Sequence, residues 1–183
     1  MKKIISLLLC LALVYCLAAS FAESAPNQFT ATVRDRFRLT GPLPEGYQYS
    51  IQSQDDLTTR AAIASEDPSA PVMTLVISFN ESYADIQRLN DLPEDQFEHI
   101  KAGFSEMNEV TFDTLETSHG TKLLIVRETG ADLDFLVFYT IYLGHEVELR
   151  LAPGEGSENP VLTEAQIQKC IDFLSDLDFS PIG

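Results

Sequence analysis

The sequence predicts an α+β fold, in which helices flank a mainly antiparallel sheet that contains a four-strand meander. Between residues 110 and 152, apolar residues alternate with polar ones in four segments that only the short turns SHG, TGA and GH separate. Connections this short force neighbouring strands to run antiparallel. Two other segments carry apolar residues three or four positions apart, which is the spacing of a helix with one buried face.

Shorter strands are expected before the meander. The stretch FTATVRDRFRL, from Phe29, indicates one or two strands, and further strands are expected at 47–53 and in AAIAS. The run VMTLVISF, residues 72–79, is apolar enough to be a central strand buried on both faces.

Capping residues place the expected helices. Ser82 is suited to cap a helix in SYADIQRLN, and Asp91 with Glu94 predicts a capping box at the start of DLPEDQFEHIKAGFSEM. Thr163 and Gln166 predict a second capping box before the apolar stripe of TEAQIQKCIDFLSDL. The overall order is therefore strands, helix, meander and terminal helix.

The first 22 residues have the layout of a secretory signal peptide. Two lysines precede an apolar run, and small residues lead to an expected cleavage after Ala22. The alternative is an uncleaved membrane anchor, since the apolar stretch approaches the ~20 residues that span a bilayer. Residues 23–28 are then a flexible lead-in and residues 29–183 a single domain, secreted or otherwise extracytoplasmic.

Charge and cysteine content exclude some classes of partner. Cleavage leaves ten basic and 28 acidic residues, a net charge of −18 with neutral histidines. Nucleic acid and anionic membranes are excluded as partners, because both are bound through neutralised phosphates. A protein or small ligand outside the cytoplasm is compatible with this charge. Cys170 is the single cysteine left, and its place in a helical stripe predicts an inert core residue.

His145 and Glu146, in LGHEVELRLA, are the first candidates for chemistry. A zinc-protease motif would place a second histidine four residues after His145, where Leu149 stands. The alternation instead directs Val147, Leu149 and Leu151 to the core and Glu146 to solvent. The pair is therefore interpreted as part of a hairpin turn, with no catalytic residue. No phosphate-binding glycine loop or dinucleotide motif occurs, so no cofactor is implied.

A metal-dependent or hydrolytic enzyme is the alternative hypothesis. His119 and His145 lie in alternate turns of the meander, which share one end of the sheet, and Glu116 or Glu146 could supply a third metal ligand. The two turns would be two strand spacings, roughly 10 Å, apart. That separation is long for one metal ion.

The order of elements resembles the PsbP-like α/β/α sandwich, found also in small exported bacterial proteins of the DcrB group. The resemblance is carried by PEGY at 44–47, GTKLLIV at 120–126 and a terminal helix expected to end in LDF, at Phe179. It implies a non-enzymatic binding or accessory protein, with no family site residue to transfer. Tyr47 and Tyr49, near the PEGY turn, are the candidate binding residues if they are exposed; packing in the core is the alternative.

Overall fold

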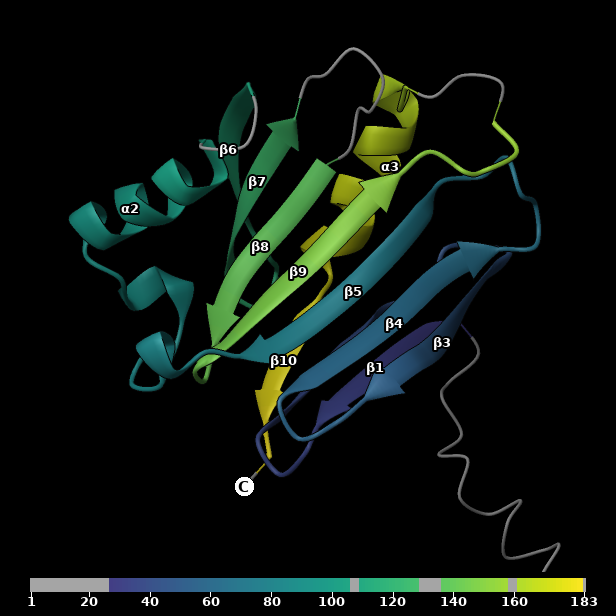
Figure 1. Cartoon of the computed structure of the whole chain (residues 1–183). Coiled ribbons are helices and arrows are strands. Elements are labelled where there is room, and N and C mark those ends of the chain that lie inside the picture. The colour runs from purple at the N-terminus through teal and green to yellow at the C-terminus, as the bar shows by residue number, and fades with distance from the viewer. Residues whose placement is uncertain (1–26, 106–108, 129–135, 158–160, 183) are drawn as a thin grey trace, which may run out of the picture.

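The computed structural model describes residues 27–105, 109–128, 136–157 and 161–182. Within these ranges the chain forms ten strands, arranged as two antiparallel sheets, together with two α-helices and two short 3₁₀ helices (Figure 1). The signal peptide and most of the lead-in expected from the sequence lie outside the described residues. No helix in the described ranges is long and apolar enough to cross a membrane.

The larger sheet has seven strands in the order β3-β4-β5-β9-β8-β7-β6. Its strands are β3 (Tyr47–Gln54), β4 (Thr58–Ser65), β5 (Val72–Phe79), β6 (Val110–Glu116), β7 (Lys122–Glu128), β8 (Leu136–Tyr142) and β9 (His145–Ala152). The last four are the expected meander, and they lie side by side in chain order. Pairing of β5 with β9 joins this meander to the early strands, with Leu75 opposite Leu149.

The smaller sheet has three strands in the order β1-β2-β10. Its strands are β1 (Gln28–Val33), β2 (Phe37–Pro42) and β10 (Asp178–Pro181). The first two pair as a hairpin within FTATVRDRFRL, where one or two strands were expected. The third comes from the far end of the chain and pairs Phe179 with Leu39.

One face of the seven-stranded sheet, here called the inner face, packs against the smaller sheet and against α3 (Glu164–Ser175). Aromatic rings connect the layers: Phe37 of β2 meets Tyr142 of β8 edge-on, with 5.1 Å between ring centroids. The hydroxyl of Tyr142 donates a 2.9 Å hydrogen bond to the carbonyl oxygen of Phe179. The main core of the protein therefore lies between the two sheets.

The opposite, outer face is covered over only part of its width. Helix α2 (Glu94–Ser105) and the 3₁₀ helices Glu81–Tyr83 and Leu89–Asp91 pack on the β6–β8 side, where Phe97 and Ile100 meet outward side chains of β7 and β8. Figure 1 shows α2 beside that half of the sheet, with the outer side of β3, β4 and β5 left open.

This uneven cover decides which strand is buried on both faces. Every residue of β8 is buried, whereas β5 buries Met73, Leu75 and Ile77 on its inner face and leaves its outward residues only half-buried. The expectation of a two-faced central strand at 72–79 is thus wrong for β5. That environment belongs to β8, because α2 covers its outer face.

The predicted helix-flanked α+β sandwich is wrong. The fold is mostly antiparallel β, and a second sheet occupies much of the layer that the sandwich assigned to helices. The segment expected to end the terminal helix, with Phe179, is instead strand β10. Pairing with β2 satisfies the backbone groups along one edge of this strand.

The helix starts were predicted with mixed success. The capping box of Thr163 and Gln166 is confirmed at the start of α3. Asp91 does not cap α2: it ends a 3₁₀ helix, and α2 begins at Glu94, after Pro93. Ser82 likewise lies inside a 3₁₀ helix, whose N-cap is Asn80.

Replacing Phe138 by alanine should cost about 3–5 kcal/mol in the free energy of unfolding, because the ring fills the core between the sheets and is 2% exposed. Ile51→Ala is the control, since Ile51 is 53% exposed and should cost less than about 1 kcal/mol. Urea unfolding measures both. Equal costs would contradict the position assigned to the core.

Candidate functional site

The larger of two cavities with binding potential lies between α3 and the inner face of the large sheet, and is here called the α3 cavity. Its volume is about 810 Å³. It is lined by Pro42, Leu43, Pro44, Glu45, Tyr47, Ser65, Ala70, Pro71, Met73, Leu151, Gln166, Lys169, Cys170, Asp172, Phe173 and Asp176. This volume is within the range of small-molecule sites.

The α3 cavity combines an apolar floor with a polar mouth. Met73, Leu151 and Phe173 are buried core residues and form part of the floor. The exposed charged side chains are one lysine and three carboxylates: Lys169, Glu45, Asp172 and Asp176. The mouth is therefore acidic overall, and it disfavours an anionic ligand.

The two candidate tyrosines lie on the inner face, and neither is fully exposed. Tyr47 lines the α3 cavity and donates a 2.9 Å hydrogen bond to the carbonyl oxygen of Pro71. Tyr49 packs against Phe29, and its buried hydroxyl has no hydrogen-bond partner among the described residues. Both rings are partly buried and pack against the core, and Tyr47 also lines the cavity.

Cys170 is buried in α3, where its stripe position predicted it. Its sulfur lies 3.8 Å from the sulfur of Met73. Burial raises the pKa of its thiol to about 12, because the thiolate would lose its hydration. The residue contributes an apolar wall to the cavity, with little thiolate at neutral pH.

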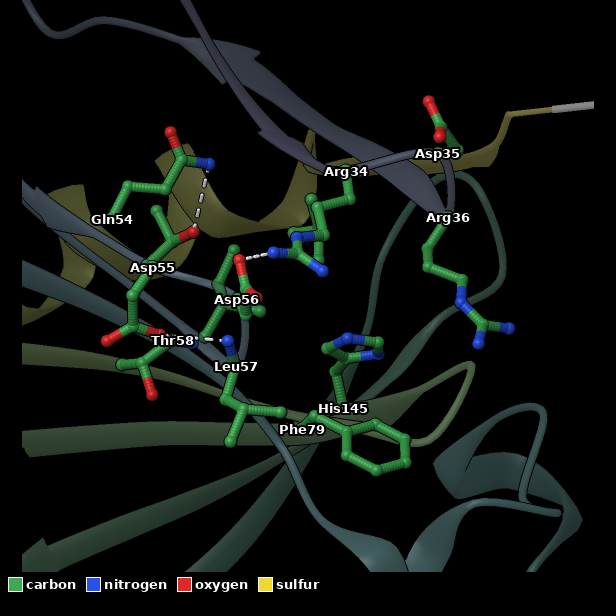
Figure 2. Close-up of a pocket in the computed structure, with 13 residues that line it drawn as sticks. Arg34, Asp35, Arg36, Gln54, Asp55, Asp56, Leu57, Thr58, Phe79 and His145 are labelled. Carbon is green, nitrogen blue, oxygen red and sulfur yellow. Dashed lines mark hydrogen bonds and ion pairs between the residues drawn. The ribbon is translucent and has the colours of Figure 1, made fainter.

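The second cavity lies at one end of the space between the sheets, and is here called the hairpin cavity (Figure 2). Its volume is about 330 Å³. The β1–β2 turn, the β3–β4 turn and the ends of β5 and β9 supply its walls: Val33, Arg34, Asp35, Arg36, Gln54, Asp55, Asp56, Leu57, Thr58, Thr59, Ile77, Phe79 and His145.

His145 forms part of the floor of the hairpin cavity. It is the first residue of β9, after the turn at Leu143 and Gly144, and its ring lies edge-on to Phe37 and Phe79 at 5.4 Å from each. Nδ1 lies 2.8 Å from the carbonyl oxygen of Leu143. A carbonyl accepts only, so this contact places the proton on Nδ1. Desolvation, with the charge of Arg36, lowers the pKa of the imidazole.

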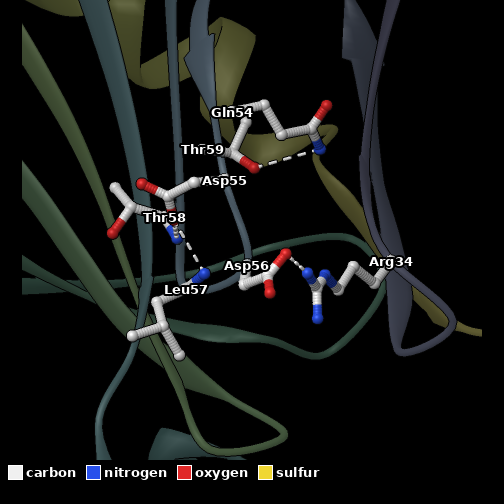
Figure 3. A network of polar contacts seen from close by, with 7 residues as sticks. All are labelled: Arg34, Gln54, Asp55, Asp56, Leu57, Thr58 and Thr59. Atoms are coloured by element: carbon white, nitrogen blue, oxygen red, sulfur yellow. Dashed lines mark hydrogen bonds and ion pairs between the residues drawn. The ribbon is translucent and has the colours of Figure 1, made fainter.

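The mouth of the hairpin cavity is organised by carboxylates of the β3–β4 turn (Figure 3). One oxygen of Asp55 accepts 2.8 Å hydrogen bonds from the backbone N–H groups of Leu57 and Thr58, which lowers the pKa of this carboxyl. Asp56 forms an ion pair with Arg34 across the mouth. Two turns from different sheets are thereby connected.

The histidines of the enzyme hypothesis line different cavities. His119 is exposed, with Nδ1 3.9 Å from Asp178, and lines a surface hollow beside β2. His145 is buried in the hairpin cavity, and Glu116 is exposed on β6. In the described ranges, no three His, Cys, Asp or Glu side chains come close enough together to hold a metal ion.

Glu146 points to the opposite face from its neighbour His145. Its two oxygens accept hydrogen bonds from the side-chain amide of Asn80, at 2.9 Å, and the hydroxyl of Tyr139, at 2.8 Å. Burial and this carboxylate raise the pKa of Tyr139. The alternation predicted the face of Glu146 correctly, but the side chain is half-buried and not in solvent as expected. Opposite faces explain why His145 and Glu146 cannot act on one ligand.

Sequence reasoning missed Arg34 and Arg36. The signal was the segment VRDRFR, where three of the ten basic residues outside the leader fall within five positions of an otherwise acidic chain. Periodicity assigned these residues to strands. It could not show that the turn between them lies beside His145.

No known protein family and no characterised protein matches this chain in sequence. The functional interpretation therefore depends on the geometry and chemistry of the two cavities.

Cys170 should react with a thiol reagent roughly a thousandfold more slowly in the folded protein at pH 8 than in urea, because each unit of raised pKa reduces the thiolate about tenfold. Absorbance of the released reagent chromophore measures both rates. A folded-state rate equal to the rate in urea would contradict the buried position.

The free energy of unfolding should fall as the pH drops below 6.5, the ordinary pKa of histidine, toward the lower pKa of folded His145. The folded state holds this imidazole neutral. The stability that the neutral ring contributes is therefore present above pH 6.5 and is lost as the ring is protonated. His145→Gln should show a smaller loss between pH 7.5 and pH 5 in urea unfolding. His119→Gln, at an exposed histidine, is the control and should retain the full loss.

Proposed function

We propose that this chain is an exported, non-enzymatic binding protein that holds a small, mainly apolar molecule in the α3 cavity. The observation that carries the proposal is a cavity of about 810 Å³ with an apolar floor and a polar mouth. Binding sites for small molecules combine these features, because burial of apolar area supplies affinity while a few polar groups orient the ligand.

The charge of the mouth narrows the ligand class. One lysine stands among three exposed carboxylates, so the polar end of the ligand is neutral or positively charged. The body of the ligand is apolar, because Met73, Leu151 and Phe173 offer no hydrogen-bonding groups. A neutral or cationic amphipathic molecule satisfies both conditions.

Tyr47 supports the assignment of this cavity. Its ring lines the wall, and its hydroxyl is already bonded to Pro71. The ring can therefore contact a ligand without burying an unpaired hydroxyl. This role retains one of the two binding residues expected from the sequence and assigns Tyr49 to packing.

Export supports a binding role outside the cytoplasm. The proposal includes cleavage after Ala22, and the acidic chain that remains would repel nucleic acid and anionic lipid surfaces. The ligand is then a molecule encountered in the cell envelope or in the medium.

The neutral apolar dye Nile red is a suitable probe for the α3 cavity. Its fluorescence should rise on addition of the purified protein, and Ala70→Trp should reduce this binding at least about tenfold, because an indole at that half-buried wall position fills the cavity. An anionic dye of similar size should bind more weakly to the unaltered protein.

Ala102→Trp is the matched control. It adds the same ring at an exposed position of α2, on the outer side of the large sheet, and should leave dye binding unchanged. Equal binding by both variants, or equal loss in both, would refute the α3 cavity as the site.

A further inference from the structure

The hairpin cavity is lined by a buried histidine with one ring nitrogen that no described protein group bonds. His145 is only 6% exposed, and its Nδ1–H is directed to the carbonyl oxygen of Leu143. Nε2 has no partner among the described residues, and the ring lines the cavity. A nitrogen that lines a cavity without a protein partner is available to water or to a ligand there.

One cationic side chain beside His145 is left without a protein partner in the described part of the chain. Figure 2 shows its ring between the side chains of Arg34 and Arg36, both from the β1–β2 turn. Arg34 is paired with Asp56, whereas the guanidinium of Arg36 has no partner among the described residues. Nε2 of the imidazole and the guanidinium of Arg36 are therefore the groups that have no protein partner in the described ranges.

The nearby carboxylates do not supply the missing partner. Asp55 is engaged by two backbone N–H groups, and Asp56 by Arg34. Asp35 is exposed at the β1–β2 turn, and its side chain points away from His145 in Figure 2. An oxyanion from outside the chain can complete the set.

Apolar side chains distinguish this site from a simple phosphate site. Leu57 and Phe79 line the same cavity and are 61% and 36% exposed, so the cavity presents apolar area to solvent. Val33 and Ile77 extend the apolar wall inward. A ligand with an apolar body would cover the exposed pair while its charged end faces the arginine.

We propose that the hairpin cavity binds a small monocarboxylate with an aliphatic or aromatic body, whose carboxylate bridges Arg36 and His145 and whose body packs against Leu57 and Phe79. The site is independent of the α3 cavity: its mouth carries arginines, and the two linings share no residue.

Binding is coupled to proton uptake from solvent. A carboxylate beside His145 stabilises the imidazolium, so Nε2 gains a proton that it donates to the ligand. Arg34 and Arg36 from one turn oppose this protonation, and Asp55 and Asp56 from the other favour it. The bound anion supplies the largest change, so affinity should rise as the pH falls toward 6.

Histidine ring NMR with ¹⁵N-labelled protein tests the site directly, because the chain has only three histidines. Benzoate is the probe. It should raise the pKa of His145 and leave His99 and His119 unchanged. Benzyl alcohol, which keeps the ring and lacks the charge, and inorganic phosphate, which keeps the charge and lacks the ring, should each have much smaller effects.

Arg36→Gln should weaken benzoate binding about tenfold or more, since it removes a charge-assisted hydrogen bond at an exposed position that does not hold the core. Arg38→Gln removes the same charge two residues away, outside the cavity lining, and should change little. No response of His145 to benzoate, equal weakening by both variants, or a response to phosphate as strong as that to benzoate would each overturn the proposal.

Discussion

Strand β8 has no exposed face, and this single constraint organises the molecule. Its inward side chains, including Phe138 and Tyr142, need one apolar layer, while its outward Val137, Tyr139 and Ile141 need another. The small sheet and α3 provide the first layer, and α2 with its preceding 3₁₀ helices provides the second. Because β8 lies between two cores, it buries apolar side chains on both of its faces. The other elements are therefore placed so that both faces are covered.

Both cavities lie at boundaries between the elements that cover the inner face of the large sheet. The α3 cavity lies beside the β2–β3 connection, where the helix meets the edge of the early strands. The hairpin cavity lies at the opposite limit, where the turns of the two sheets come together. The twist of the strands makes two packed layers diverge toward their corners. Cavities can therefore form at the corners, while side chains fill the centre.

The sequence allowed the local elements to be predicted better than their assembly. Short turns were sufficient for the meander, and Thr163 with Gln166 was sufficient for the start of α3, because these signals act within a few residues. Pairing of Leu75 with Leu149 and of Leu39 with Phe179 depends on residues far apart in the chain, and no local pattern encodes it. The same limit applies to the candidate sites: Tyr47 could be suggested from its sequence neighbours, whereas the position of Arg36 beside His145 needed the assembled sheets.

Strand β10 has a further consequence for the order of folding. It is only four residues long, yet it completes the small sheet. The carbonyl oxygen of its Phe179 also accepts a hydrogen bond from the hydroxyl of Tyr142. Until that segment has been synthesised, β2 lacks one neighbour and the core lacks one wall. Native pairings between the two ends of a chain form slowly, because loop closure costs entropy before contacts compensate for it. The small sheet is therefore expected to close after the meander, whose strands are neighbours in the chain.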